Sequence, residues 1–193
     1  MKNYFILVII IIIIIYIIYK IYYNYIFTIN VKSTIDSKYY RVKNTINKQQ
    51  SADTFAIING RIEKLINNLQ NDSSIFDKNI MLLTKRYNPD NLIENIDNHS
   101  TSYTLNKGSE VAICISSKND TKNNEIHEIN RLMFVVIHEL SHIGCESQGH
   151  NKEFVDFFIY LLKKSIEYKI YKYENYTTNP VEYCGITINN TPI

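Results

Sequence analysis

An apolar stretch that runs into a pair of histidines constrains the fold of this chain more than any other feature. Residues 132–137 read Leu-Met-Phe-Val-Val-Ile and are followed by His-Glu-Leu-Ser-His at 138–142. The run favours a buried helix, and residues four apart on a helix share one face. His138 and His142 therefore project side by side from an apolar helix, where polar groups without partners are costly.

This arrangement matches the H-E-x-x-H pattern, in which two histidines bind zinc and the glutamate is the general base. We therefore predict that His138 and His142 are zinc ligands and that Glu139 is the catalytic base. A solvated helix face that happens to carry two histidines is the alternative, and the apolar residues on both sides disfavour it.

A hydrolytic zinc site needs three protein ligands and one open position for water. After His142 the chain makes a short polar turn between Gly144 and Gly149 and then reaches His150. Because this turn can fold the chain back, we predict His150 as the third ligand, with Cys145 and Glu146 as substitutes.

A second helix is predicted immediately after His150. Asn151 is a suitable N-cap, and the residues behind it repeat at helical spacing. That apolar face consists of Phe154, Phe157, Phe158, Leu161 and Leu162. His150 therefore stands at the hinge between two helices.

Residues 138–142, the glycine-containing turn, His150 and Phe154 together resemble the WLM metallopeptidases, which are relatives of the SprT and Spartan proteases. The stretch 103–111, Tyr-Thr-Leu-Asn-Lys-Gly-Ser-Glu-Val, is similar to a turn and strand of that family. The resemblance covers about residues 55–165. It implies an α+β, zincin-like domain with a small sheet, an active-site helix, a Zn²⁺ cofactor and peptide-bond hydrolysis. The overall layout resembles membrane-anchored WLM-type proteins of large DNA viruses.

The N-terminus is predicted to be a transmembrane helix. Residues 4–19 are almost wholly apolar, Lys20 interrupts them, and residues 21–29 continue with many tyrosines. A spanning helix needs ~20 apolar residues, and a lysine near its end can extend its amine to the interface. A signal peptide is the alternative, but no small-residue cleavage site follows. We therefore assign residues 1–29 to an anchor that contacts the lipid bilayer through residues 4–29.

The orientation of this anchor is predicted from its flanking charges. Lys2 precedes the span, whereas the basic residues behind it are Lys20, Lys32, Lys38, Arg41, Lys43 and Lys48. This bias places the C-terminal domain on the cytoplasmic side of a cellular or virion membrane. Acceptor tripeptides for N-glycosylation begin at Asn71, Asn98, Asn119, Asn175 and Asn189, as expected by chance in an Asn-rich chain.

The rest of the chain divides into a polar, basic stalk over residues 30–52 and a peptidase domain over residues 53–193. A helix is predicted from about Ser51 with Asp53 as its cap, and its core positions are Phe55, Ile58, Ile62, Leu65, Ile66 and Leu69. Short strands are predicted at 80–83, 102–105 and 111–115, with a turn at 106–108 and irregular chain over 91–100. Residues 111–116 are the predicted strand for binding the substrate backbone.

The charge and the cysteine content bear on nucleic-acid binding and on the redox compartment of the protein. The 21 basic and 19 acidic residues give a net charge of +2, which offers no strong evidence for nucleic-acid binding. An odd number of cysteines, Cys114, Cys145 and Cys184, favours a reducing compartment without a disulfide framework. A Cys145–Cys184 bridge, or either of these residues near the metal, is the alternative.

Three further side chains, His127, His99 and Tyr183, are of types that can act in a site. His127 lies about three turns from His138, ~16 Å along the helix, so we predict a surface or capping position for it. We predict the same kind of position for His99, which lies in a polar loop. Tyr183 is a candidate donor to the oxyanion of a tetrahedral intermediate, with a packing role as the alternative.

The sequence thus predicts a membrane-anchored zinc metallopeptidase that acts on a protein or peptide substrate. One alternative is a non-catalytic membrane or virion structural protein with a zinc site, for which four protein ligands would be typical. A further alternative is a DNA–protein crosslink protease, for which a basic tail or additional zinc-binding cysteines would be expected.

Overall fold

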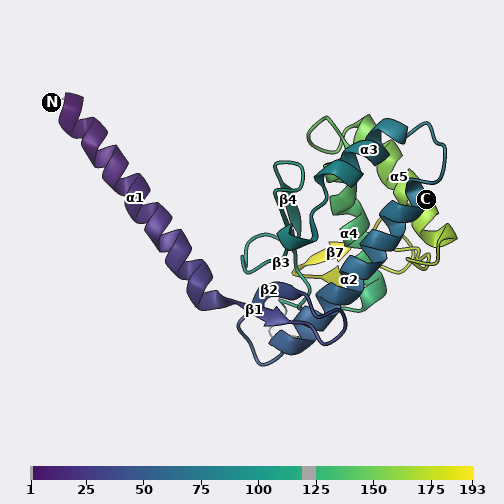
Figure 1. Ribbon diagram of the computed structural model, residues 1–193, viewed down its shortest axis with the longest axis horizontal. Coiled ribbons are helices and arrows are strands. Elements are labelled where there is room, and N and C mark those ends of the chain that lie inside the picture. Colours follow the sequence, from purple (N-terminus) through teal and green to yellow (C-terminus); the bar gives the residue numbers. More distant parts are fainter. Residues whose placement is uncertain (1, 119–124) are drawn as a thin grey trace.

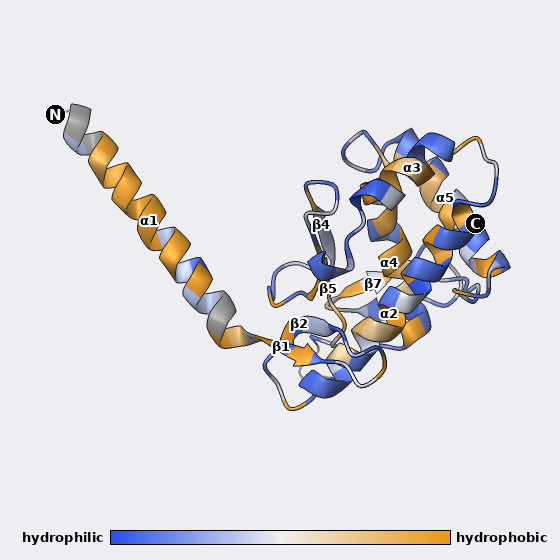
Figure 2. Cartoon of the chain, in the orientation of Figure 1, coloured by the Kyte–Doolittle hydropathy of each residue, from blue (hydrophilic) through white to orange (hydrophobic). Residues whose placement is uncertain are grey.

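The N-terminal segment forms α1 (Lys2–Phe27), which extends away from the rest of the chain (Figure 1). The computed structural model describes residues 2–118 and 125–193. Residues 6–23 are long and apolar enough to cross a membrane, and none of this window is buried. Figure 2 shows the apolar character along most of α1. The acceptor tripeptide that begins at Asn119 lies outside the described residues.

The predicted stalk over residues 30–52 is wrong. β1 (Thr28–Lys32) follows α1 directly and pairs antiparallel with β2 (Tyr39–Lys43). Tyr40 and Val42 are only 2% and 0% exposed, while the basic residues between and beside them stay closer to solvent. Because basic residues alternate with the two buried residues of β2, the sequence of this half-buried strand resembles a polar segment.

The predicted core helix is confirmed as α2 (Lys48–Leu69), and all six of its predicted core positions are buried. It begins earlier than expected, and Asp53 lies inside it rather than at its cap. The Asp53 carboxylate accepts hydrogen bonds from the Ser33 hydroxyl and the Thr34 backbone N–H, both at 2.7 Å. Asp53 thus fastens the loop after β1 to the helix.

The strand predicted at residues 80–83 is instead part of a helix, α3 (Asp77–Arg86). Its buried residues are Ile80 and Leu83, which lie three apart, whereas Met81 is exposed. An apolar run of four residues fits a strand or a helix equally well. Here Asp77 in the first turn and Arg86 in the last suit the helix dipole.

A five-stranded sheet has the order β1-β2-β3-β5-β4. β3 (Leu92–Glu94) follows the short 3-10 helix η1 (Pro89–Asn91), so part of the stretch predicted to be irregular is a strand. β3 pairs in parallel with both β2 and β5 (Glu110–Ile113). The predicted hairpin is confirmed: β4 (Tyr103–Leu105) pairs antiparallel with β5 and forms one edge of the sheet.

Two further helices follow the strands of the main sheet in the chain. α4 (Ile129–Gly144) carries residues 138–142, and α5 (Lys152–Glu167) begins with Asn151 as its N-cap, as predicted. A Cβ on Gly144 would lie 2.3 Å from the ring of Phe157, so a glycine lets α4 end against α5. The role of α4 as an active-site helix stays a prediction at this point.

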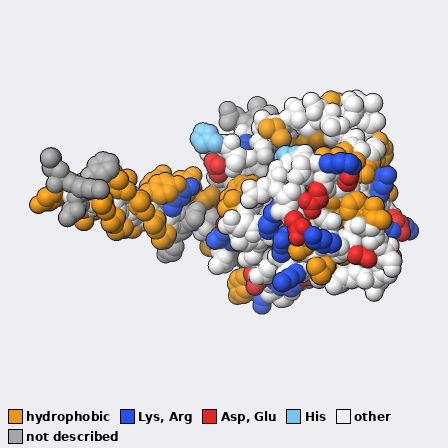
Figure 3. Space-filling model, turned by 90° about the horizontal axis from the view of Figure 1, so that it is seen from above, with side chains coloured by type: hydrophobic (Ala, Val, Ile, Leu, Met, Phe, Trp, Pro, Cys, Tyr) orange, Lys and Arg blue, Asp and Glu red, His pale blue; other side chains and the backbone are white. Residues whose placement is uncertain are grey.

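A separate two-stranded sheet, β6 (Val181–Tyr183) and β7 (Ile186–Ile188), lies near the C-terminus. The described residues thus form a mixed α/β structure with five α-helices and a small main sheet. In Figure 3, apolar side chains dominate α1, whereas basic and acidic side chains are interspersed on the visible face of the body.

Candidate metal centre and active-site cleft

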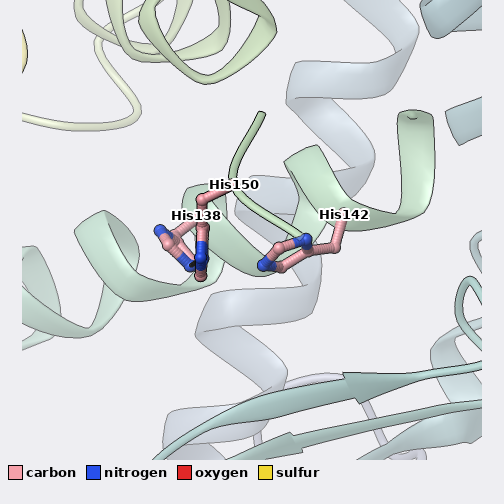
Figure 4. Close-up of side chains that lie close together, drawn as sticks. All are labelled: His138, His142 and His150. Atoms are coloured by element: carbon pink, nitrogen blue, oxygen red, sulfur yellow. Dashed lines mark hydrogen bonds between the residues drawn. The ribbon is translucent and has the colours of Figure 1, made fainter. Parts of the chain in front are cut away.

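The three predicted ligands lie together. His138 and His142 sit one turn apart on α4 with ring centroids 5.0 Å apart. The turn after α4 brings His150 to within 4.9 Å of both, again between ring centroids. Their ligand atoms all lie within 4.8 Å of one another, and Figure 4 shows the three side chains close together.

This geometry fits a zinc ion. Zn–N bonds of ~2.0–2.1 Å place tetrahedral nitrogen ligands roughly 3.4 Å apart. The Nε2 atoms of His150 and His138 are 3.0 Å apart, so a small rotation of either ring gives the required spacing. Of the residues that the structure describes, the group of possible ligands comprises these three histidines, and their binding of a metal stays a prediction.

Both histidines on α4 favour the neutral form that ligates metals. Burial lowers the pKa of His138 to about 3, with smaller contributions from His142 and His150. Burial also lowers the pKa of His142 to about 4, helped by His150 and Lys107. Neutral imidazoles keep a lone pair available for a metal, whereas imidazolium ions do not.

The ring of Phe154 supports all three imidazoles from α5. It stacks on His142 with centroids 4.3 Å apart and an interplanar angle of 27°. It also meets His138 and His150 edge to face at 4.8 and 4.7 Å. Phe154 is 2% exposed, so it forms a fixed apolar base beneath the cluster.

The backbone that leads into the turn is held by two basic side chains. The Arg86 guanidinium on α3 donates to the carbonyls of Ile143 and Cys145, both at 2.9 Å. The Lys107 amine, from the turn between β4 and β5, donates to the His142 carbonyl at 3.3 Å and to the Ser147 carbonyl. The bonds to Ile143 and His142 satisfy carbonyl groups at the end of α4 that have no partner within the helix, and the bonds to Cys145 and Ser147 hold the turn that follows.

Glu153, in the first turn of α5, organises the same turn from the other side. Its carboxylate accepts the backbone N–H groups of Glu146 and Ser147 at 3.0 and 3.1 Å, together with the Ser147 hydroxyl. Asn79 on α3 donates to this carboxylate and to the Gly144 carbonyl, both at 3.1 Å. The position of His150 therefore depends on contacts from α3 and α5.

The substitutes for the third ligand are engaged elsewhere. The Glu146 carboxylate pairs with Lys78 at 2.6 Å on the surface. Cys145 is buried, and its sulfur lies 4.0 Å from the Asn79 amide. Neither residue belongs to the histidine group.

Glu139 is buried next to the three histidines, with 4% of its surface exposed. Burial raises the pKa of its carboxyl to about 7, although a hydrogen bond from Thr104 opposes this rise. The Thr104 hydroxyl, on edge strand β4, donates to Oε2 of Glu139 at 2.8 Å. The position of Thr104 in a strand was predicted, but its contact with α4 was not, because it joins residues 35 apart in the chain.

A cavity of about 650 Å³ opens over these groups. Its lining combines residues of α4, the turn at His150, β4 with its following turn, and the β6–β7 hairpin. The residues predicted to bind the substrate backbone, 111–116, belong to β5 and its continuation, which β3 and β4 flank on both sides. The prediction is therefore wrong: β4, rather than β5, is the edge strand that borders the cavity.

The cysteine prediction is also wrong. Cys114 and Cys184 form a disulfide across 70 residues, and Cys145 is free. Sequence spacing gives no measure of the spatial distance between cysteines, so this pair was missed. Cys184 therefore offers no thiolate to a metal.

The chain has close viral relatives. It is 39% identical over 163 residues to the uncharacterized protein R325 of Acanthamoeba polyphaga mimivirus, a match that spans 82% of this chain and 81% of R325. This chain belongs to the R325 family. The uncharacterized protein 136R of Invertebrate iridescent virus 6 is 33% identical over 70 residues, covering 36% of this chain and 38% of that protein. No protein-family model matches the chain.

Among solved structures, the crystal structure of Wss1 from Saccharomyces cerevisiae is similar to this R325-family chain. Its TM-score is 0.49 and its sequence identity is 17%, with 66% of this chain and 88% of the Wss1 chain covered.

Two other predicted residues of this R325-family chain need correction or refinement. His127 is 8% exposed rather than superficial, and its Nε2 accepts the Cys184 backbone N–H at 3.3 Å. Tyr183 lines the cavity, but its hydroxyl donates to the Cys114 carbonyl at 2.8 Å and lies 2.5 Å from the Ser102 hydroxyl. Burial raises the pKa of Tyr183, and these contacts favour its packing role over oxyanion binding.

Proposed function

We propose that this protein is a membrane-anchored zinc metallopeptidase that hydrolyses peptide bonds. The observation that supports it best is the convergence of His138, His142 and His150 beside the buried carboxylate of Glu139, at the base of a cavity. This arrangement combines three nitrogen ligands, a base and space for a substrate.

Zinc is the metal that suits this set of ligands. Three imidazoles with one open position are typical of catalytic zinc sites, whereas structural sites usually have four protein ligands. Among the described residues, the two candidates for a fourth ligand lie outside the histidine group: Cys184 is in a disulfide, and Cys145 is free but its sulfur lies against the Asn79 amide. This favours catalysis over a zinc site that serves folding alone.

The protein's own groups would move the proton. Bound zinc would supply a Lewis acid that makes water a nucleophile near neutral pH. Glu139 would take the proton of the attacking water and return it to the leaving amine. The Thr104 hydroxyl, which bonds to Oε2 of Glu139, would hold this carboxylate in one orientation.

A polypeptide substrate would lie along β4. This strand pairs with β5 on one side and borders the cavity. An extended peptide can add to such an edge through backbone hydrogen bonds, which accept many sequences. A cleft bordered by an edge strand thus suits a protein or peptide substrate.

The proposed membrane attachment is through α1. Its apolar window, residues 6–23, approaches the ~20 residues needed to span the hydrocarbon core. Because β1 begins at the residue after α1 ends, the catalytic domain would stay close to the bilayer.

The experiment uses the full-length protein in detergent, with zinc content and cleavage of an unfolded protein substrate as readouts. We expect one zinc per chain in the wild type and in Glu139→Gln, with cleavage by the variant reduced ~10²–10⁴-fold. His142→Ala should lose both zinc and activity. Cleavage that survived Glu139→Gln at the wild-type rate would refute the mechanism, and absence of zinc from the wild type would refute the site.

A further inference from the structure

One wall of the cavity comes from the β6–β7 hairpin. This hairpin is a separate sheet, and Tyr183, Ile186 and Ile188 line the cavity. Tyr183 pairs with Ile186, and Val181 pairs with Ile188. Directly paired residues of an antiparallel ladder share one face, so these four side chains form an apolar face while Glu182 and Thr187 point the other way.

Part of this face is open to a ligand. Ile186 is 50% exposed although it lines a cavity, and Val135 of α4, one turn before His138, lines the same space. The charged residues among the described lining, apart from the histidines, are Glu139 and Lys107. Branched aliphatic side chains cannot hydrogen-bond a polar group, but they gain about 25 cal/mol for each Å² of apolar surface that they bury.

The hairpin is held firmly enough to discriminate between side chains. Cys184 lies in the turn of the hairpin and is linked by the disulfide to Cys114, which directly follows β5. The Tyr183 hydroxyl donates to the Cys114 carbonyl, and the Arg131 guanidinium of α4 donates to the Glu182 carbonyl at 3.1 Å. The apolar face is therefore preorganised beside the metal group.

We propose that Ile186 and Ile188 are specificity-determining residues, which select substrates with a large apolar side chain next to the scissile bond. This proposal rests on the proposed peptidase function and names the substrate class of the same site. A peptide held between β4 and the hairpin must direct side chains toward β7, where Leu, Ile or Phe would bury apolar surface. A charged side chain there would lose hydration without gaining a partner.

The test digests a mixture of peptides of randomised sequence with the zinc-loaded full-length protein and identifies the cleavage sites by mass spectrometry. We expect the wild type to prefer large apolar residues at one position beside the cleaved bond by about tenfold, as is typical of apolar pockets. Ile186→Glu should lose this preference and favour Lys or Arg at that position. Ile75→Glu is the matched control, because Ile75 is 95% exposed and is not among the residues that line the cavity.

The outcomes separate the two proposals. A zinc-loaded wild type that cleaves no peptide overturns the peptidase function and the specificity proposal with it. Cleavage without an apolar preference, or with the same preference in Ile186→Glu, overturns the specificity proposal and leaves the peptidase intact. Thermal unfolding checks that Ile186→Glu is folded. Ile188→Ala, a milder change, should weaken the preference and so gives a second test that does not introduce a charge.

Discussion

The ring of Phe154 stacks on the imidazole of His142, with the two centroids 4.3 Å apart and their planes at 27°. The same ring meets His138 and His150 edge to face. One side chain of α5 therefore fixes the orientation of all three proposed ligands, although they come from α4 and from the turn that follows it.

Phe154→Leu should weaken zinc binding by about tenfold, because groups that orient metal ligands typically contribute 10–100-fold to affinity. The measurement is competition with a chromophoric chelator. Phe55→Leu is the matched control, since Phe55 is also fully buried but lies on α2, where its ring stacks on Tyr40. An equal loss of zinc affinity in both variants would show that general packing, rather than contact with the histidines, explains the effect.

Glu153 should make the stability of the metal-free protein depend on pH. Burial tends to raise its pKa, but hydrogen bonds from the Ser147 side chain and from the Glu146 and Ser147 backbone outweigh burial and lower the pKa to about 2. A carboxylate whose pKa is lowered by folding stabilises the fold at pH values above its pKa in the unfolded chain, about 4.3. This contribution disappears as the pH falls toward 2.

Glu153→Gln should therefore be less stable than the wild type above pH 5, by about 1 kcal/mol because the group is partly solvated. The gap should close as the pH falls toward 2. Urea denaturation in the presence of a chelator measures this gap. Asp156→Asn, which removes a surface partner of Lys152 on the same helix, should change stability little. A gap for Glu153→Gln that stayed constant from pH 7 to pH 2 would contradict the assignment.

The helices and the histidine group were predictable because their signals are local. The helical spacing of Phe55, Ile58 and Ile62 places them on one face whatever surrounds them, and the same holds for His138 and His142. His150 was predictable because the turn before it is short. The roles of these residues in metal binding and catalysis are proposals that the fold alone does not test.

Features that depend on distant parts of the chain were not predictable. The run at 80–83 fits two periodicities, and the burial of Ile80 and Leu83 in an element that contacts α4 decides in favour of a helix. β2 was missed because basic residues flank its two buried positions. The Thr104–Glu139 contact and the Cys114–Cys184 disulfide join residues 35 and 70 apart, which no local pattern records.

The disulfide should contribute strongly to stability. The two cysteines are 70 residues apart in the sequence, and closing a loop of this length lowers the entropy of the unfolded chain. The loss of entropy stabilises the folded protein by about 4 kcal/mol at 25 °C. We expect the double variant Cys114→Ser/Cys184→Ser to lose roughly this amount in urea denaturation, and the wild type to lose a similar amount in strong reductant. Cys145→Ala should keep its sensitivity to reductant, because Cys145 is free. A wild type whose unfolding is unaffected by reductant would argue against the disulfide in solution.

If α1 spans a membrane, two features of the chain predict opposite sides for the domain. The lysines after α1 favour the cytoplasmic side, whereas a Cys114–Cys184 disulfide persists best in an oxidising compartment. We expect the disulfide to be the better guide, because a covalent bond that fastens a cavity wall must survive where the protein works. Expression in eukaryotic cells should then give a protein whose gel mobility changes on treatment with N-glycosidase. Asn98→Gln, at an exposed acceptor position, should reduce that change. Unchanged mobility of the wild type would return the domain to the cytoplasmic side and would require the disulfide to form there.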